Sequence, residues 1–319
     1  MDTKRSALSD FHFHTVHSDG SETVASAIEE AKARGVASLA LTDHNDGEGM
    51  PEFISLCKAS GLKYVEGVEI YAAFPLSEEW SQDPSYCSPI PDLTILGRKL
   101  DWRIFKEEYV DPLMQYWQTI FVPQSLKQLE ENGLTIPEIA EVKFEDFATA
   151  IGILHDVPNN PQSWGPLLEI AKQHKPDITA EDIEQSPVRW ANRYLYAFGM
   201  NAYVLRGPKE FTVEHAVDLA EEMGGLLFAA HPGGEYANWS EEHLQYFIEA
   251  GGHGIEAWQY FHSQEQIRHF LELAIQHELT VSGGSDWHGT NGRPTMGCWD
   301  KQEAQTPSWV FEQLMDRLP

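Results

Sequence analysis

The sequence places a short, almost continuously apolar run at Val36-Ala37-Ser38-Leu39-Ala40-Leu41-Thr42. Turn residues bound this run, a pattern typical of a strand that is buried on both faces of a parallel sheet. The preceding segment, Thr23 to Arg34, carries apolar side chains at helical spacing, and Gly35 follows it as a helix terminator. The two segments predict a helix followed by a buried strand, the repeating unit of α/β folds.

The same alternation of helix and strand recurs on both sides of the middle of the chain. We predict seven strands, four before residue 100 and three after residue 207, over 10–14, 36–42, 63–70, 92–97, 226–231, 254–258 and 279–286. Helices are predicted between them over 23–34, 51–60, 213–223, 241–250 and 264–277. Seven parallel strands with outer helices favour an α/β barrel of the TIM-like type, and an open doubly wound sheet is the alternative.

The middle of the chain lacks the alternation of helix and strand. Long stretches at 109–129, 137–153 and 187–198 have helical patterns, and prolines such as Pro123 and Pro158 punctuate them. We therefore predict a barrel formed by residues 1–99 and 208–319, with residues 100–207 as a helical insertion that could act as a substrate lid.

Charge and cysteine content narrow the function. The 319 residues carry a formal net charge of −28, which argues against nonspecific binding to a nucleic-acid backbone, because such binding needs lysine and arginine. Cys57, Cys87 and Cys298 form no metal-binding or disulfide pattern. Neither a signal peptide nor a long apolar run is visible, so we expect a cytoplasmic protein without membrane association.

Two histidines on the first strand could bind one ion. His12 and His14 are two residues apart, so both side chains leave the same face of the strand. Asp286 and His288 repeat this spacing just past the last strand. In a parallel barrel the C-terminal ends of the strands form one face, where active sites are built.

Most of the other predicted strands also deliver a histidine or carboxylate at this face. The complete set of candidate metal ligands is His12, His14, Asp19, His44, Glu69, His231, Asp286 and His288. Eight converging ionisable groups would repel one another or stay unsatisfied without cations, so the sequence predicts a metal centre. Asp43 could join it or cap the following helix.

Several ordered motifs resemble one family. They are Asp10-Phe11-His12-Phe13-His14, Ser18-Asp19-Gly20, Leu41-Thr42-Asp43-His44, Gly67-Val68-Glu69, Ala230-His231-Pro232, Gly254-Ile255-Glu256 and Gly284-Ser285-Asp286-Trp287-His288. In order and spacing they resemble the PHP (polymerase and histidinol phosphatase) family. The resemblance implies a distorted (βα)7 barrel with up to three metal ions. Asp19 and the insertion look like the subgroup of small-molecule phosphoesterases that hydrolyse nucleotides.

The resemblance also implies how the ligands are shared. One ion would be held by His12, His14, Glu69 and Asp286, and a second by Asp19, His44 and His288. A third would be held by Glu69, His231 and a further histidine on the fourth strand, where this sequence has Thr94. Imidazole and carboxylate ligands without thiolate suit Zn, Mn or Fe, so two or three such divalent ions are expected.

These inferences predict a metal-dependent phosphoesterase. A metal-bound hydroxide would attack phosphorus in a small phosphorylated substrate, for which a nucleotide is one candidate. We assign catalytic roles to His231, His288 and Asp19. Arg293, Arg193 and His155 are the candidates for binding the substrate, since guanidinium groups bind phosphate bidentately.

Two alternative functions stay open. One is an exonuclease or proofreading nuclease of the same family, although no nucleic-acid-binding module is visible and only a short oligonucleotide would fit this prediction. The other is a noncatalytic, metal-binding regulatory module with a degenerate centre, which Thr94 makes conceivable.

Overall fold

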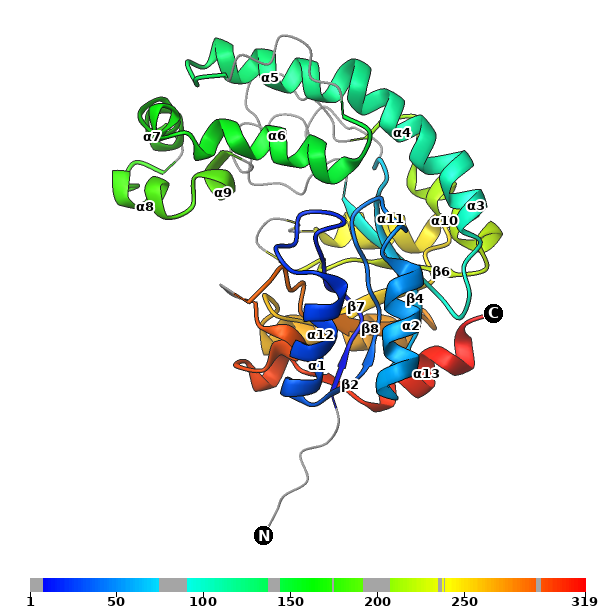
Figure 1. The fold of residues 1–319 in the computed structure, drawn as a ribbon. Helices are drawn as coiled ribbons and strands as arrows, with labels where there is room; N and C mark the ends of the chain where they lie inside the picture. Colours follow the sequence, from blue (N-terminus) through cyan, green and yellow to red (C-terminus); the bar gives the residue numbers. More distant parts are fainter. Residues whose placement is uncertain are drawn as a thin grey trace.

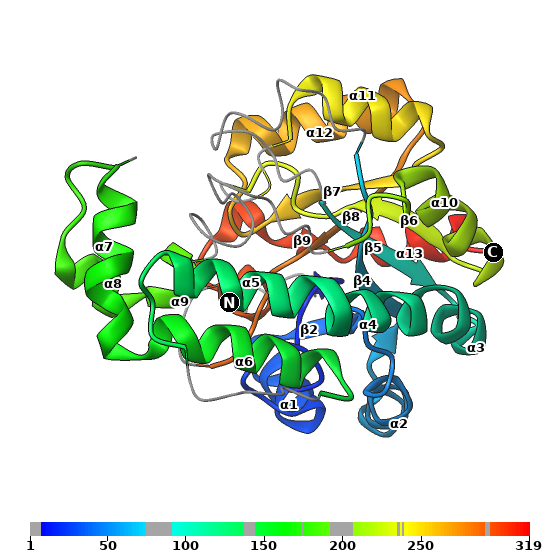
Figure 2. The same ribbon diagram turned by 90° about the horizontal axis from the view of Figure 1, so that it is seen from above.

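The strands form two sheets. A computed structural model describes residues 8–74, 91–136, 144–173, 175–191, 207–234, 237, 239–290 and 294–319. Within these residues a four-stranded sheet has the order β3-β2-β1-β9, and a five-stranded sheet has the order β4-β5-β6-β7-β8. Helices flank both sheets, with α11 and α12 on one side and α1 and α2 on the other (Figure 2). The α/β class predicted from the sequence is confirmed.

The first sheet is mostly parallel. It contains β1 (Leu8–Asp10), β2 (Val36–Leu39), β3 (Lys63–Tyr64) and β9 (Thr306–Pro307). β1, β2 and β3 run parallel, whereas β9 pairs with β1 in the antiparallel direction. The decisive apolar run thus forms β2, and its last residues continue past the strand toward the end where the candidate ligands lie.

The second sheet corrects one prediction. It contains β4 (Glu66–Tyr71), β5 (Asp92–Gly97), β6 (Leu226–Ala229), β7 (Gly254–Gln259) and β8 (Thr280–Gly284). β5 is antiparallel to both neighbours, β4 and β6, so the prediction of seven parallel strands is wrong. The apolar pattern of residues 92–97 specifies a buried strand but carries no information about its direction.

Both edge strands of the second sheet, β4 and β8, adjoin the chain that continues from β2 and β1 of the first sheet. Single parallel bridges pair Phe13 with Trp287 and His44 with Glu69. Near the first bridge, the Phe11 amide donates to the Gly283 carbonyl at 3.0 Å, and the Asp286 amide donates to the His12 carbonyl at 2.8 Å. These contacts bring the strand ends of both sheets to one place.

Local sequence sets the helix boundaries. The Thr23 side chain accepts a hydrogen bond from the Ser26 amide at the start of α1, and Gly35 ends this helix with a φ of 75°. The helices around the sheets are α1 (Val24–Arg34), α2 (Met50–Ser60), α10 (Val213–Glu222), α11 (Glu241–Glu249), α12 (Gln264–Gln276) and α13 (Trp309–Arg317). The first five match the predicted helices to within one residue at either end; α13 was not predicted.

The insertion is helical and begins with one long helix. This helix consists of α3 (Trp102–Phe105), α4 (Asp111–Tyr116) and α5 (Val122–Glu131), joined by π-helical turns at Lys106–Val110 and Trp117–Phe121. The wide turns precede Pro112 and Pro123, which lack an amide donor, so the helix continues where proline usually ends one. The sequence therefore predicted too short a helix at 109–129.

The rest of the insertion lies above and to one side of the sheets. Its helices are α6 (Phe147–Asn159), α7 (Trp164–Lys172), α8 (Ala180–Gln185) and α9 (Pro187–Ala191). With α5, α6 lies above the sheets (Figure 1), whereas α7 and α8 lie to one side of them (Figure 2). Residues 137–143 and 192–198, which belong to two of the predicted helices, lie outside the described residues. Tyr109 and Trp117 are buried in the same apolar cluster as Ile95 and Phe228 of the second sheet.

A close approach between β8 and β1 requires glycine. A Cβ atom on Gly284 would lie 2.3 Å from His12 Cβ and 2.5 Å from His12 N. We therefore expect Gly284→Ala to lower the free energy of unfolding by about 1–3 kcal/mol, the usual cost of overpacking, and to displace His12. Chemical denaturation and metal content measure the two effects.

Gly152→Ala is the matched control. Gly152 lies in α6, and a Cβ atom there would meet no atom within 4 Å. This substitution should raise stability by roughly 0.5–1 kcal/mol, because alanine is the better helix former. Equal effects of the two substitutions would contradict the assigned packing.

Candidate metal centre

The structure brings all eight predicted ligands together. His12 and His14 follow β1, Asp19 lies in the next turn, and His44 follows β2. Glu69 lies on β4, His231 follows β6, and Asp286 and His288 follow β8. Their ligand atoms gather in groups whose members lie within 4.8 Å of one another: His14, Asp19, His44 and His288; His12, Glu69 and His231; His12, His14 and Asp286.

The deepest group surrounds Glu69. The Nε2 atoms of His12 and His14 lie 3.2 and 3.3 Å from Glu69 Oε2 and 3.2 Å from each other. His14 Nε2 is also 3.2 Å from Asp286 Oδ1. His12, His14 and Glu69 are fully buried, so the atoms that meet here are shielded from water.

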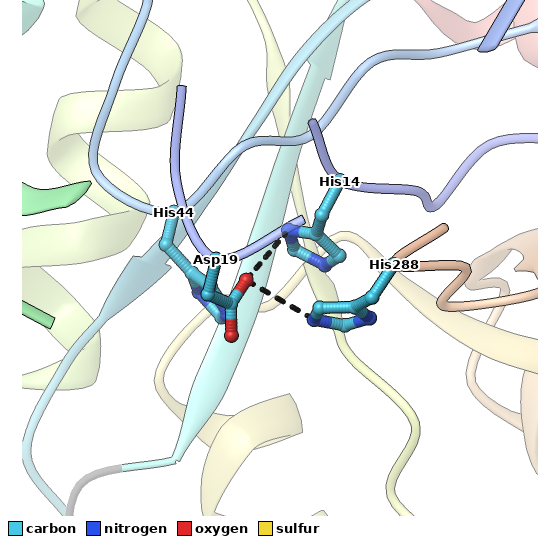
Figure 3. A group of neighbouring side chains, drawn as sticks. All are labelled: His14, Asp19, His44 and His288. Atoms are coloured by element: carbon cyan, nitrogen blue, oxygen red, sulfur yellow. Dashed lines mark ion pairs between the residues drawn. The ribbon is translucent and has the colours of Figure 1, made fainter. Parts of the chain in front are cut away.

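A second group surrounds Asp19 (Figure 3). Asp19 Oδ1 lies 3.1 Å from His288 Nε2, 3.8 Å from His44 Nε2 and 4.0 Å from His14 Nδ1. The side chains of Asp19 and His288 are 22% and 35% exposed, whereas those of His14 and Glu69 are 0% exposed. The cluster therefore opens to solvent at the Asp19 and His288 end.

Glu69 joins these groups to His231. Its Oε1 atom lies 3.1 Å from His231 Nε2, while its Oε2 atom lies 3.1 Å from His44 Nδ1. His231 and Asp286 both have positive φ, 32° and 59°, a region that residues other than glycine adopt rarely. Strain of this kind occurs at functional sites, where surrounding contacts fix the backbone.

Buried carboxylates hold the candidate ligands in position. Glu256 accepts from the His231 amide at 2.6 Å through Oε2, and its Oε1 lies 2.9 Å from His12 Nδ1. Asp43 accepts hydrogen bonds from the Thr15 amide at 2.6 Å and from the Ser18 hydroxyl at 2.7 Å. Asp43 thus anchors the turn that carries Asp19. It does not cap the following helix, which begins after Gly49, and both of its carboxylate oxygens accept hydrogen bonds from this turn.

The electrostatics show a cluster that requires positive charge. Burial opposes protonation of His12, but Glu69 and Glu256 outweigh burial and raise the pKa of His12 well above its usual value. Burial likewise opposes ionisation of Glu69, yet His12 and His44 hold the pKa of Glu69 well below its usual value. Burial lowers the pKa of His44 despite Glu69 and Asp19. The buried imidazole of His12 and the buried carboxylate of Glu69 thus favour each other's charged form.

The donor set fits divalent cations. Asp19 Oδ1, His44 Nδ1 and Glu69 Oε2 are buried and accept or donate no hydrogen bond among the described residues, although each has ion-pair contacts. Such atoms are costly unless something charged binds them. Imidazole and carboxylate ligands at this spacing suit Zn, Mn and Fe.

Two of the three predicted substrate-binding residues, Arg193 and Arg293, lie outside the described residues. The third, His155, is on α6 in the insertion. Burial lowers the pKa of His155, and the charges of Asp19 and His288 act on it as well. His155 thus belongs to the helix that lies above the sheets in Figure 1.

The sequence analysis missed Asp92. The ligand atoms of His44, Glu69 and Asp92 also lie within 4.8 Å of one another. Asp92 is the first residue of β5, and because β5 is reversed, this end lies beside the C-terminal end of β4. Knowledge of the strand direction would have been needed to find it.

The fold and the cluster define an α/β protein with a candidate metal centre, and comparison with known proteins supplies the family. A model of the PHP domain matches residues 10–181, more than half of the chain. The chain therefore belongs to the PHP family.

Characterised relatives cleave phosphate esters. The chain is 26% identical over 288 residues to the phosphoribosyl 1,2-cyclic phosphate 1,2-diphosphodiesterase of Eggerthella lenta, covering 90% of this chain and 96% of that one. It is 27% identical over 305 residues to the 3',5'-nucleoside bisphosphate phosphatase of Chromobacterium violaceum, covering 94% of each. It is also 27% identical over 292 residues to the 5'-3' exoribonuclease Rnm of Escherichia coli, covering 90% and 87%.

A solved structure shares the fold. A protein of Bifidobacterium adolescentis described as a metal-dependent phosphoesterase superposes with a TM-score of 0.64 at 24% identity, covering 97% of this chain and 96% of that one. At this identity the likeness extends to the fold alone.

His262 supports the turn after His231 and makes stability depend on pH. Its Nδ1 donates to the Ala257 carbonyl at 2.9 Å, and its Nε2 accepts from the Gly233 amide at 3.0 Å. Burial lowers the pKa of His262 from 6.5 to about 4. The unfolded chain thus binds a proton more readily than the folded one, so this contribution to stability is lost as the pH falls below about 6.5.

We expect His262→Gln to flatten this pH dependence. Glutamine can keep both hydrogen bonds but does not titrate. Between pH 7 and pH 5, with chelator present, the free energy of unfolding should fall by about 2 kcal/mol less in the variant than in the wild type. Urea denaturation at each pH measures the difference, and identical pH profiles would contradict it.

Proposed function

We propose that this protein is a metal-dependent phosphoesterase that hydrolyses a small phosphorylated substrate, with nucleotides as the first class to test. The observation that carries the proposal is the convergence of eight histidine and carboxylate side chains from both sheets at one buried site. The relatives from Eggerthella lenta and Chromobacterium violaceum, which act on a cyclic phosphate and a nucleoside bisphosphate, support it.

The same residues would hold two or three divalent ions. His12, His14, Glu69 and Asp286 form the first ligand set, and Asp19, His44 and His288 form the second. Glu69 and His231 would contribute to a third. When bound, Zn, Mn or Fe ions would supply positive charge that polarises phosphate oxygens and activates water.

The exposed end of the cluster supports the assignment of roles. A phosphate group can approach from the side of Asp19 and His288, whose side chains are 22% and 35% exposed. Asp19 Oδ1 and His288 Nε2, 3.1 Å apart, would contribute to catalysis by holding an ion beside the reacting phosphate. His231, buried against Glu69, would act from the opposite side of the phosphate.

The insertion would complete the site. Its α6 carries His155, whose protonation the charges of Asp19 and His288 influence. Residues 100–207 would therefore cover the substrate, and residues 1–99 and 208–319 would form one distorted (βα)7 barrel. The bridges from Phe13 to Trp287 and from His44 to Glu69 support closure of that barrel.

A nuclease activity is the second candidate. The exoribonuclease of Escherichia coli aligns with 90% of this chain, whereas the net charge of −28 disfavours a long nucleic-acid substrate. A panel of nucleoside phosphates, cyclic phosphates and short oligonucleotides distinguishes the candidates. Metal binding without hydrolysis of any of them would instead support the noncatalytic module.

The cellular location stays a prediction. Among the described residues, no helix has both the length and the apolar character needed to cross a membrane. Cys57 and Cys298 are buried free thiols, consistent with the expected cytoplasmic location.

Loss of one central ligand should abolish both metal binding and hydrolysis. We expect His14→Ala and Asp286→Ala to lower the metal content and to reduce kcat at least 100-fold, because ligand loss weakens a shared centre. Elemental analysis and phosphate release measure the outcome. His269→Ala, at a surface pair with Glu241, is the control. Unchanged metal content and turnover in both ligand variants would refute the site.

Loss of His155 should affect substrate binding and leave the metal in place. Because His155 lies on α6, the helix above the sheets, His155→Ala should raise KM about tenfold, the effect of one lost charge-assisted hydrogen bond. Metal content should equal that of the wild type. A wild-type KM would remove His155 from the substrate-binding residues.

A further inference from the structure

Asp92 occupies a place in the cluster that neither the family motifs nor the relatives' names assign. It starts β5 directly opposite Tyr71, and Thr94 lies opposite Glu69 in the same register. Residues opposite each other in a sheet share a face, and so do residues two apart along one strand. Asp92, Thr94 and Glu69 therefore all point to the face that carries the cluster.

Thr94 is poorly suited to bind a metal ion. It is buried beside Glu69, but a hydroxyl is a much weaker ligand than imidazole or carboxylate. Asp92 lies one pleat nearer the open end of the sheet and offers a carboxylate instead. Its ligand atom lies within 4.8 Å of those of Glu69 and His44.

Charge favours a cation at this position. Asp92 is 9% exposed and Glu69 is 0% exposed, so two carboxylates converge where little water can screen them. A cation bound between the two carboxylates lowers their mutual repulsion. His44, which points Nδ1 toward Glu69 Oε2 at 3.1 Å, adds a nitrogen ligand to the two oxygens.

We propose that Asp92, Glu69 and His44 bind a divalent ion, in place of the third set built on Glu69 and His231. Asp92 provides the carboxylate ligand that Thr94 lacks, and His44 meets Glu69 at Oε2, whereas His231 meets it at Oε1. The inference rests on the proposed function, because Glu69 would be shared with the other ions. A neutral imidazole has one lone pair, so His44 would serve this ion through Nδ1 and would leave the second ligand set. Asp19 and His288, 3.1 Å apart, would remain for the neighbouring ion.

The donor set determines the metal preference. Two carboxylate oxygens and one nitrogen form a harder site than the histidine-rich groups around it. Oxygen ligands suit Mn²⁺, whereas imidazole ligands favour Zn²⁺. Relative to the rest of the centre, this position selects Mn²⁺.

Metal stoichiometry tests the proposal. Full-length protein is stripped with chelator, reloaded with Mn²⁺ or Zn²⁺, dialysed and measured by elemental analysis. Asp92→Asn should bind about one equivalent of Mn²⁺ less than the wild type. Asp92→His should keep the total, but its Mn²⁺-to-Zn²⁺ ratio under competition should fall about tenfold.

Glu66→Gln is the matched control. Glu66 is a buried carboxylate on the same strand as Glu69, but it accepts from the Leu100 amide at 3.0 Å and from Trp102 Nε1 at 2.9 Å. Its substitution should leave the Mn²⁺ count unchanged. An equal loss of Mn²⁺ in Glu66→Gln and Asp92→Asn would attribute the effect to the sheet and overturn the proposal.

Other outcomes separate this inference from the proposed function. If the wild type binds metal and hydrolyses phosphate esters while Asp92→Asn keeps every equivalent of Mn²⁺, only the role of Asp92 is wrong. If the wild type binds no divalent metal, both proposals fail. If Asp92→Asn does not fold, as judged by circular dichroism, the Mn²⁺-to-Zn²⁺ ratio of Asp92→His tests the proposal instead. A ratio equal to that of the wild type would overturn it.

Discussion

The carboxylate of Glu69 is the group on which the rest of the structure depends. It is fully buried and contacts four imidazoles from three other strand ends: His12, His14, His44 and His231. Its strand meets His44 through one of the bridges that join the two sheets. Burying an unpaired carboxylate costs several kcal/mol, so the seam between the sheets is stable only when positive charge surrounds Glu69. Divalent ions would therefore stabilise the fold as well as provide the chemistry.

The sequence predicted elements and site residues well where periodicity or spacing carries the signal. The helix at 23–34 and the strand at 92–97 match α1 and β5 to within one residue, because one amphipathic period and one short apolar run define them. All eight predicted ligands converge, although their binding of metal stays a prediction. Strand direction depends on the path of the connecting segment, which no local sequence pattern specifies. For this reason the direction of β5 was predicted wrongly, and Asp92 was not recognised as a member of the cluster.

Buried aromatic side chains attach the first helix of the insertion to the second sheet and to the loop after β2. The Tyr109 hydroxyl donates to Asn45 Oδ1 at 2.7 Å and accepts from the Tyr71 amide at 2.7 Å. The Trp117 ring stacks on Tyr71 at 6.3 Å, and Tyr71 in turn lies 5.7 Å from the His44 ring. These contacts involve Asn45, which follows the candidate ligand His44, and Tyr71, which contacts the His44 ring. Movement of the long helix would therefore change the position of His44. The position of the long helix and the geometry of the candidate metal centre therefore depend on each other.

The insertion also matters for how a strongly acidic protein could select a phosphorylated substrate. With a net charge of −28, the surface repels phosphate at long range, so attraction must arise within the few ångströms around the centre. Exposure rises from 0% at Glu69 to 35% at the His288 side chain, and Figure 1 shows α6 above the sheets. A bound phosphate would meet ligands on one side and the insertion on the other. Ions would then provide affinity for phosphate in general, and the contacts of the insertion would decide which phosphorylated molecule fits.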